Sequence, residues 1–361
     1  MKRHFNIPIF IPHLGCPFDC IFCNQKKIAA TLKAPGLPEI KTIIEEHLRT
    51  LPAASEVELA FFGGTFTAID KDEQIKYLEL IQPYLKSGKI ASIRLSTRPD
   101  FINNSILGLL KEYGVKTIEL GVQSLDDGVL KKSGRGYKVE DVFRAAHLIK
   151  EHNFMLGLQL MVGLPGDNYS LDIKSTWAAI SLVPDMVRIY PTLVIKETFL
   201  AKLYADGKHQ PLDLTQAVTI TKEMYLRFMA HNIKVIRMGL HPSEELSSGD
   251  ALIAGPFHPA FGELVMQEVF YDMVQYLLGQ FQETIKLGNE LTIYINPKDF
   301  SKMLGNRKNN IAKLKNSLQI DDIKINGTEN MALNSVGIST SGDIPSHILQ
   351  REDYLKNFFK I

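Results

Sequence analysis

The sequence predicts an α/β fold in which a partial (β/α)6, TIM-like barrel is followed by a small α+β extension. Apolar, β-branched runs alternate with segments of helical period over roughly the first two thirds of the chain. This alternation stops after about residue 207. The length of 361 residues suits one large domain with a smaller appendage. We therefore expect the barrel over residues 1–240 and the extension over residues 241–361.

Six apolar runs have the length and composition of buried strands. They cover residues 6–12, 57–63, 92–97, 115–122, 155–163 and 186–194. Amphipathic segments such as 39–51 and 72–85 lie between them, with apolar residues at steps of three and four. Later in the chain, the pattern indicates helices over 214–232 and 263–281, with the strand-like stretch 232–240 between them.

Composition excludes several classes of protein. Hydrophobic residues make up 45% and charged residues 22% of the chain, as in an ordinary globular protein. The net charge is +1, so the average charge gives no reason to expect binding to nucleic acid or to a membrane. No run approaches the ~18–20 apolar residues of a membrane-spanning helix, and the first residues lack a cleavage-site pattern. We expect a cytoplasmic protein without a membrane partner, and its oligomeric state stays open.

Distinctive residues follow each predicted strand, where the loops of a parallel α/β fold carry the chemistry. The loop after the first strand holds the three cysteines of the chain, Cys16, Cys20 and Cys23. The candidates after the other strands are Gly63, Gly64 and Thr65; Ser96 and Arg98; Gln123 and Ser124; Gln159 and Leu164; and Tyr190.

The spacing of the three cysteines favours an iron–sulfur cluster, because three thiolates in a compact loop fit one face of an iron–sulfur cube. Four irons and three cysteines leave one iron open to a small molecule, as catalytic metals keep an open position. The main alternative is a zinc site with His13 as fourth ligand. Three unrelated buried cysteines are a further alternative. An odd, clustered set of cysteines argues against a secreted disulfide framework.

The stretch Cys16-x-x-x-Cys20-x-Phe22-Cys23 resembles the signature of the radical S-adenosylmethionine (SAM) enzymes. The resemblance implies a barrel of the radical SAM type and a [4Fe-4S] cluster whose open iron binds SAM. It also implies reductive cleavage of SAM to a 5′-deoxyadenosyl radical, with a reductant such as flavodoxin or ferredoxin. By this resemblance Phe22 packs near the adenine, although an aromatic ring here also suits an apolar cover of the cluster.

Further motifs carry the resemblance around the rim. Gly63-Gly64-Thr65 resembles the glycine motif that receives the methionyl amino group, with Thr65 where many members have Glu; a tight turn is the alternative. Residues 121–137 resemble the fourth-strand region of oxygen-independent coproporphyrinogen oxidases and of the Elongator catalytic subunit. This match assigns Gln123 and Ser124 to the ribose or methionyl end of SAM. It assigns Arg135 to the SAM carboxylate, and a solvated surface charge is the alternative.

The remaining motifs narrow the resemblance to one branch. Residues 159–167 resemble the motif that lines the adenine, with Leu164 in that motif and with Gln159 where some relatives have an acidic ribose ligand. Residues 96–100, with Ser96 and Arg98, and residues 188–208, with Tyr190, look specifically like the Elongator catalytic subunit. The similarity covers about residues 5–240.

The substrate is the open question. The Elongator catalytic subunit carries an acetyltransferase domain and modifies the wobble uridine of tRNA. Residues 241–361 show no glycine-rich acetyl-coenzyme-A loop, so the sequence looks like a shorter bacterial relative to which acetyl transfer is not carried over. We expect a radical SAM enzyme that modifies RNA, either tRNA or rRNA. The alternatives are a small metabolite or tetrapyrrole as substrate, and a non-catalytic protein that binds RNA or delivers a cofactor.

Two segments of the extension bear on this question. Residues 291–316 resemble the strand–helix–loop–helix of a KH-type RNA-binding module, placed at about 288–340, although the loop Gly305-Asn306-Arg307-Lys308 lacks the second glycine. Arg307, Lys308 and Lys313 are the candidate RNA-binding residues, and a solvated helix face is the alternative. His241, Glu244, Glu245 and the stretch 255–259, with His258, are candidates for a substrate wall.

Overall fold

The structure is a computed structural model, and it describes residues 3–12, 14–16, 20–24, 34–52, 55–241, 243–280, 290–339 and 344–359. The chain divides into two compact units. The first consists of residues 1–217 and 233–259, and the second of residues 218–232 and 260–361. No helix in the described part of the chain is long and apolar enough to cross a membrane.

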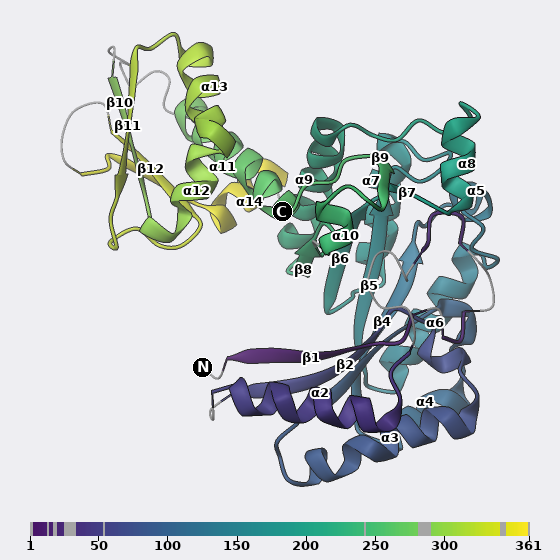
Figure 1. Cartoon of the computed structure of the whole chain (residues 1–361). Coiled ribbons are helices and arrows are strands. Elements are labelled where there is room, and N and C mark those ends of the chain that lie inside the picture. The colour runs from purple at the N-terminus through teal and green to yellow at the C-terminus, as the bar shows by residue number, and fades with distance from the viewer. Residues whose placement is uncertain are drawn as a thin grey trace. The chain divides into compact units, whose positions relative to one another are not determined.

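The first unit is built on a curled parallel sheet that forms a half-barrel (Figure 1). Among the described residues, this sheet has seven strands in the order β1-β2-β3-β4-β5-β6-β8. Its strands are β1 (His4–Phe10), β2 (Glu56–Phe62), β3 (Ser92–Thr97), β4 (Val115–Gln123), β5 (Met155–Val162), β6 (Met186–Pro191) and β8 (Lys234–Met238). The six predicted strands are confirmed. The strand-like stretch 232–240 provides β8, so the parallel ladder continues one strand beyond the expected six.

Helices cover the outer side of this sheet (Figure 1). The helices of the first unit are α2 (Leu37–Thr50), α3 (Lys71–Lys86), α4 (Asn104–Glu112), α5 (Asp127–Lys132), α6 (Val139–Glu151), α7 (Tyr169–Ser181), α8 (Phe199–Ala205) and α10 (Glu244–Ser247), with 3₁₀ turns at Phe66–Ala68 and Pro99–Phe101. Helix α6 is representative. Its buried residues Val142, Ala145, Ala146 and Ile149 recur at three- and four-residue steps, which makes one apolar stripe facing β4 and β5.

The loops that follow the strands gather at one end of the half-barrel, since all strands of the sheet are parallel. Two short strands, β7 (Val194–Ile195) and β9 (Leu252–Ala254), form a separate antiparallel pair after β6. Leu193 and Ile195 pack there with Leu246 and Ala251, and partly buried Phe257 packs against this cluster. The pairing fixes the segment after β8 on the same end of the unit as the cysteine loop, because residues of both segments line one cavity.

The second unit has its own sheet, in the order β11-β10-β12-β13. Its elements are α11 (Phe261–Gln280), β10 (Glu290–Ile295), α12 (Phe300–Leu304), α13 (Asn309–Leu318), β11 (Asp322–Gly327), β12 (Ser335–Ser339), β13 (His347–Gln350) and α14 (Arg351–Phe359), with 3₁₀ turns at Pro297–Asp299 and Asn306–Lys308. Helix α9 (Leu214–Ala230) contributes its residues from Val218 onward. Strand β10 pairs in parallel with β11 and antiparallel with β12. The elements follow in the predicted order, and the KH-like assignment stays a prediction.

Candidate active site

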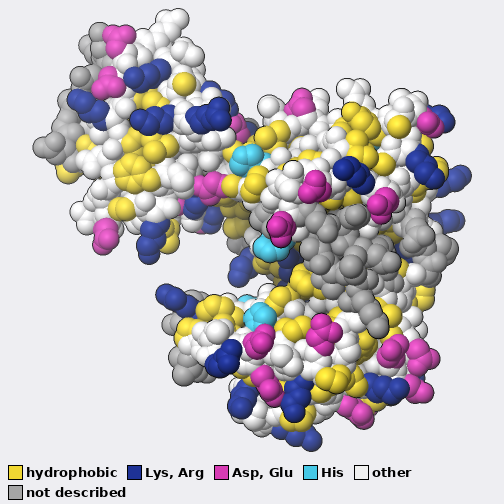
Figure 2. Space-filling view, in the orientation of Figure 1, with side chains coloured by type: hydrophobic (Ala, Val, Ile, Leu, Met, Phe, Trp, Pro, Cys, Tyr) yellow, Lys and Arg dark blue, Asp and Glu magenta, His cyan; other side chains and the backbone are white. Residues whose placement is uncertain are grey.

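A cavity of about 510 Å³ lies at the carboxyl ends of the parallel strands in the first unit. It is lined by residues from the loop after β1 and from all seven strands of the sheet or the loops that follow them. The surface of the first unit is hollowed between the part that carries β1 and the part that carries β8 (Figure 2). The described lining includes thirteen of the residues that the sequence singles out: Cys16, Cys20, Phe22, Cys23, Gly63, Gly64, Thr65, Ser96, Arg98, Gln123, Arg135, Gln159 and Tyr190.

Two candidates are not in this lining. Ser124 is buried, and its hydroxyl oxygen lies 3.4 Å from that of Ser175 in α7. Leu164 is buried in an apolar cluster with Phe22 and Leu200. The assignment of these two residues to SAM stays a prediction, and neither reaches the cavity in this structure.

Glycines seat the cysteine loop on the loop after β2. Gly15 has φ +72°, and a Cβ atom there would lie 2.4 Å from the carbonyl oxygen of Thr65. A Cβ atom on Gly64 would lie 2.5 Å from the carbonyl oxygen of Leu14. The amide of Thr65 donates to that same carbonyl at 2.9 Å. Gly64 is therefore required for the packing of the two loops, a reason that the motif alone does not reveal.

The three cysteines carry free thiols and are half-buried in the cavity wall. The Sγ atom of Cys16 lies 3.4 Å from the hydroxyl oxygen of Thr65. Burial raises the pKa of the Cys16 thiol, and the hydrogen bond with Thr65 lowers it in part. The amide of Cys23 donates to the carbonyl of Cys20 at 2.9 Å, which closes a tight turn between these two residues.

This donor set fits an iron–sulfur cluster. Three thiols from one loop line one cavity, and soft sulfur ligands select such clusters. Within the described ranges, no three His, Cys, Asp or Glu side chains form a group that could hold a single metal ion. A four-iron cluster offers each cysteine its own iron, so it does not need the three sulfurs to meet at one atom. His13, the fourth ligand of the zinc alternative, lies outside the described residues.

Arg135 lies beside the cysteines although it follows α5 in the sequence. Its Nη1 donates to the Sγ of Cys20 at 2.9 Å, and its Nη2 donates to the carbonyl of Gly121 at 2.6 Å. Its Nε donates to the hydroxyl of Tyr137 at 2.9 Å. Burial lowers the pKa of this guanidinium, but attraction to Tyr137 and Cys20 outweighs burial and raises it. The surface-charge alternative for Arg135 is wrong, because only 5% of the residue is exposed.

Tyr137 joins two arginines of the wall, and the sequence analysis missed it. The guanidinium carbon of Arg98 lies 5.1 Å, and that of Arg135 4.9 Å, from the centre of its ring. Arg98 itself is held by Asp100, with N–O distances of 3.0 and 2.8 Å. The only sequence signal for Tyr137 is its position two residues after Arg135.

Gln123 is the last residue of β4, and it has a backbone conformation that residues other than glycine rarely adopt. Its φ is +69°, and its buried Oε1 has no hydrogen-bond partner among the described residues. Strain and an unsatisfied buried acceptor are features that persist where a site requires them. Gly121 leaves the space for this side chain, since a Cβ atom there would lie 3.1 Å from Nε2 of Gln123. Gln123 thus combines a left-handed backbone with an unsatisfied buried acceptor at the cavity wall.

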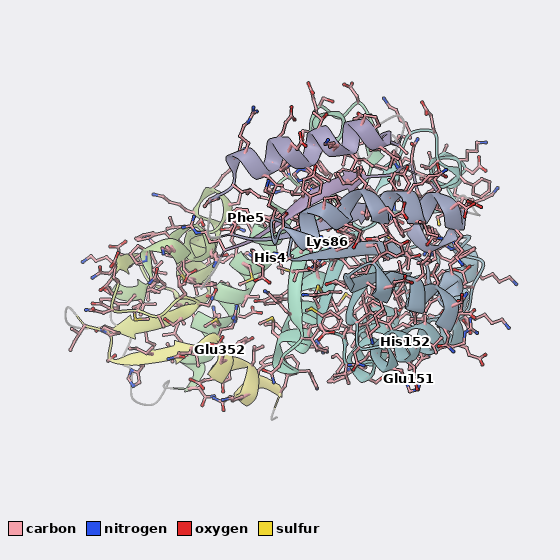
Figure 3. The ribbon with its side chains drawn as sticks, turned by 90° about the horizontal axis from the view of Figure 1, so that it is seen from below. His4, Phe5, Lys86, Glu151, His152 and Glu352 are labelled. Carbon is pink, nitrogen blue, oxygen red and sulfur yellow. The ribbon has the colours of Figure 1, made fainter. Side chains whose placement is uncertain are left out.

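A chain of buried charges runs across the strands beneath the cavity. Arg94 donates to Glu58 at 2.7 Å and to Glu119 at 2.7 Å. Glu119 also accepts two hydrogen bonds from Arg188, at 2.6 and 3.0 Å. His4, labelled at the start of β1 in Figure 3, lies 3.4 Å from Glu58. The sequence analysis also missed this network of charged residues, although each charge interrupts an otherwise apolar strand in the sequence.

Of the candidates for a substrate wall, His241 lines the cavity and is exposed, whereas His258 and Glu244 are absent from the described lining. The side chain of Glu245 lies outside the described residues. In the second unit, Arg307 and Lys308 are exposed in the loop before α13, with φ of +51° and +60°. Lys313 instead pairs with Glu268 at 2.5 Å and lies 5.4 Å from the ring of Tyr271.

Two carboxyl groups meet where the loop after β5 enters α7, namely Asp167 in the loop and Asp172 in the first turn of the helix. Burial raises the pKa of Asp167 to about 6, and the hydrogen bond with Asp172 lowers it in part. Burial and the neighbouring Asp167 raise the pKa of Asp172 further. The pair lies near Asp126, and Lys132 passes over Gly166 in the same loop. The folded protein thus holds protons here that the unfolded chain releases above its ordinary carboxyl pKa of about 3.9.

Because both pKa values are raised, this pair stabilises the fold below about pH 4, and that contribution is lost as the pH rises through about 6 and beyond. We expect Asp172→Asn to raise the melting temperature at pH 8 by roughly 3–8 °C, because the amide replaces a protonated carboxyl group. The difference from wild type should shrink towards pH 4. Thermal melts between pH 4 and 8 measure it, and a gap that is constant with pH would contradict it.

Known families match most of the chain. The model of the radical SAM superfamily matches residues 10–172, and that of the radical SAM C-terminal domain matches residues 184–270. A tRNA uridine(34) acetyltransferase of Methanocaldococcus infernus is 30% identical over 197 residues, which cover 49% of this chain and 37% of that protein. The haem chaperone HemW of Bacillus subtilis is 28% identical over 235 residues, covering 63% of this chain and 60% of that protein.

The solved structure of an archaeal Elp3 from Methanocaldococcus infernus has the same fold. It superposes with a TM-score of 0.62 at 21% identity, over 78% of this chain and 64% of that chain. This chain covers only 37%, 37% and 52% of the lengths of three curated relatives named tRNA uridine(34) acetyltransferase.

Proposed function

Because the chain belongs to the radical SAM superfamily, whose cofactors are a [4Fe-4S] cluster and SAM, we propose that it cleaves SAM reductively and uses the resulting radical to modify RNA. The observation that carries this proposal is the cavity wall in which Cys16, Cys20 and Cys23 meet Arg135 and Gln123. These residues come from separate loops and strand ends, which the parallel sheet brings to one cavity.

Each residue of the wall has a task in this proposal. Cys16, Cys20 and Cys23 hold three irons. When bound, the cluster and SAM supply one-electron cleavage of a carbon–sulfur bond to a 5′-deoxyadenosyl radical, with flavodoxin or ferredoxin as the class of electron donor. Arg135 fixes the cysteine loop through Cys20 and places a positive charge beside it. The Oε1 of Gln123 accepts a hydrogen bond from the bound cofactor.

RNA is the proposed substrate because relatives of this chain are named for tRNA uridine modification and because the second unit exposes a basic loop. Acetyl transfer, which those relatives' name also states, is not part of the proposal. To test it, anaerobically reconstituted protein is reduced and incubated with SAM and with RNA from cells that lack the protein. Digested RNA should then contain a new nucleoside formed together with 5′-deoxyadenosine. RNA that stays unchanged while 5′-deoxyadenosine accumulates would refute the RNA proposal.

The basic loop gives a separate prediction about RNA affinity. We expect the double variant Arg307→Gln/Lys308→Gln to bind RNA about tenfold more weakly, with a slope of log K against log salt lower by about 1.4 for a single strand. Lys313→Gln is the matched control, because Glu268 already engages Lys313 and its loss should change affinity little. Fluorescence anisotropy at several salt concentrations measures both effects. Equal affinities of wild type and double variant would remove this loop from the RNA site.

A tetrapyrrole is the second candidate partner, and the similarity to a haem chaperone favours it. In that case the purified protein should bind haem and shift the absorption spectrum of the haem, and it should not modify RNA. A protein that marks RNA and gives no haem spectrum would exclude this candidate.

A further inference from the structure

Two arginines stand side by side on the cavity wall formed by β6 and β8. Arg188 and Arg237 are direct partners in the parallel pairing of these strands, and both line the cavity. Like charges in neighbouring positions of a sheet repel each other, so such a pair needs compensation. Strand β8 is the last strand of the sheet and the cysteine loop follows the first, so this wall belongs to the opposite edge of the sheet.

Of the two arginines, only Arg188 forms an ion pair with a carboxylate among the described residues. Glu119 accepts two hydrogen bonds from Arg188 and is also shared with Arg94. Arg237, which is half-buried, donates from Nε to the carbonyl of Gly239 at 3.1 Å, and its Nη2 lies 3.4 Å from Nδ1 of His241. No carboxylate in the described part of the chain forms an ion pair with Arg237. The network of buried charges and Arg237 together thus contain three guanidinium groups, of Arg94, Arg188 and Arg237. They contain only two carboxylates, those of Glu58 and Glu119.

The surplus positive charge lies where a ligand can reach it. A guanidinium has five N–H donors in a planar fork, and residues within the described ranges engage only two of the nitrogens of Arg237. Tyr190 lies on the same wall, close enough to Arg237 to feel its charge. Burial raises the pKa of Tyr190, so its hydroxyl stays protonated as a further donor. The guanidinium of Arg237, the hydroxyl of Tyr190 and the imidazole of His241 could together donate hydrogen bonds to a tetrahedral oxyanion.

We propose that Arg237, with His241 beside it, binds a phosphate of the substrate nucleotide and so positions that nucleotide in the cavity. This inference rests on the proposed RNA function, because a polynucleotide brings a phosphate next to every base. Phosphate is favoured over a carboxylate because the wall offers donors from three separate side chains, which suits an anion with three free oxygens.

The test uses the full chain without its cofactors, so that it does not depend on activity. Uridine 5′-monophosphate and inorganic phosphate should raise the melting temperature of wild type, and uridine should not. Arg237→Gln should weaken uridine 5′-monophosphate binding by about tenfold or more in calorimetric titration. Arg237→Lys should fall between the two, because it keeps the charge and loses the fork. Arg144→Gln, on the exposed face of α6, is the matched control and should bind as wild type does.

Three results would overturn the phosphate subsite: no binding of phosphate or nucleotide to wild type, equal binding by Arg237→Gln, or tighter binding of succinate than of phosphate through Arg237. The subsite and the RNA function fail separately. If nucleotide binding depends on Arg237 but the protein does not modify RNA, the subsite is upheld and the RNA function is refuted. RNA marking with the same KM in wild type and in Arg237→Gln would refute the subsite and uphold the function.

Discussion

Replacement of any one of Cys16, Cys20 or Cys23 by alanine is expected to remove the iron from the protein and its SAM cleavage with it. The chain has no fourth cysteine, so no other thiolate can take the vacant ligand position. Two remaining thiolates leave half of a four-iron cluster without protein ligands. We therefore expect about four irons per wild-type chain, close to none in each variant, and 5′-deoxyadenosine at background in each variant.

The control for these variants is Thr65→Val. The hydroxyl of Thr65 lies 3.4 Å from Cys16 Sγ but belongs to no ligand set, so the valine variant should keep its iron. Iron and sulfide analysis of anaerobically prepared protein measures the outcome. Full iron content in a cysteine variant would contradict the assignment. Zinc in place of iron in the wild type would restore the zinc alternative.

The fold was predictable because each strand of a parallel sheet is buried on both faces and so has a nearly continuous apolar sequence. The runs 57–63 and 186–194 are of this kind, and they become β2 and β6. Strand β8 was harder to place. Its side chains are mostly half-buried at the edge of the sheet, so the stretch 232–240 looks like an isolated strand after a long helix.

The sequence predicted those residues of the site that lie at the ends of strands. The cysteines, Gly63, Gly64 and Gln123 follow strands and meet at one cavity for that reason. Ser124 lies one residue beyond the end of β4, where strand alternation no longer applies, and its hydroxyl oxygen lies 3.4 Å from that of Ser175 instead of in the cavity. The contact of Arg135 with Cys20 joins residues 115 positions apart through a loop. No periodicity in the sequence encodes the path of such a loop.

The buried charges show a signal that was present and not used. Glu58, Arg94, Glu119 and Arg188 each lie in the middle of an apolar run, where an unpaired charge would cost several kcal/mol. Four such interruptions in neighbouring strands therefore indicate that the charges compensate one another. The register decides which groups pair, and the sequence alone does not give it.

Glu119→Ala is expected to destabilise the first unit by about 3–5 kcal/mol, because it leaves the guanidinium groups of Arg94 and Arg188 buried without their shared carboxylate. Glu119 is 2% exposed, so its carboxylate forms these ion pairs almost out of contact with solvent. At about 2–4 °C per kcal/mol, the melting temperature should fall by roughly 6–20 °C. Glu119→Gln should cost less, since its amide oxygen still accepts from one arginine.

Two comparisons distinguish this effect from a general loss of a carboxylate. Glu151→Ala removes an exposed carboxylate at the end of α6 (Figure 3) and should change stability by less than about 0.5 kcal/mol. The double variant Glu119→Ala/Arg188→Met removes the guanidinium that loses its carboxylate, since Arg94 keeps Glu58, and fills the space with an apolar chain. It should therefore be more stable than Glu119→Ala alone. Urea unfolding of the wild type and the four variants measures these differences. Equal stability of Glu119→Ala and Glu151→Ala would show that the buried charges do not depend on one another, and the surplus charge assigned to Arg237 would then lose its basis.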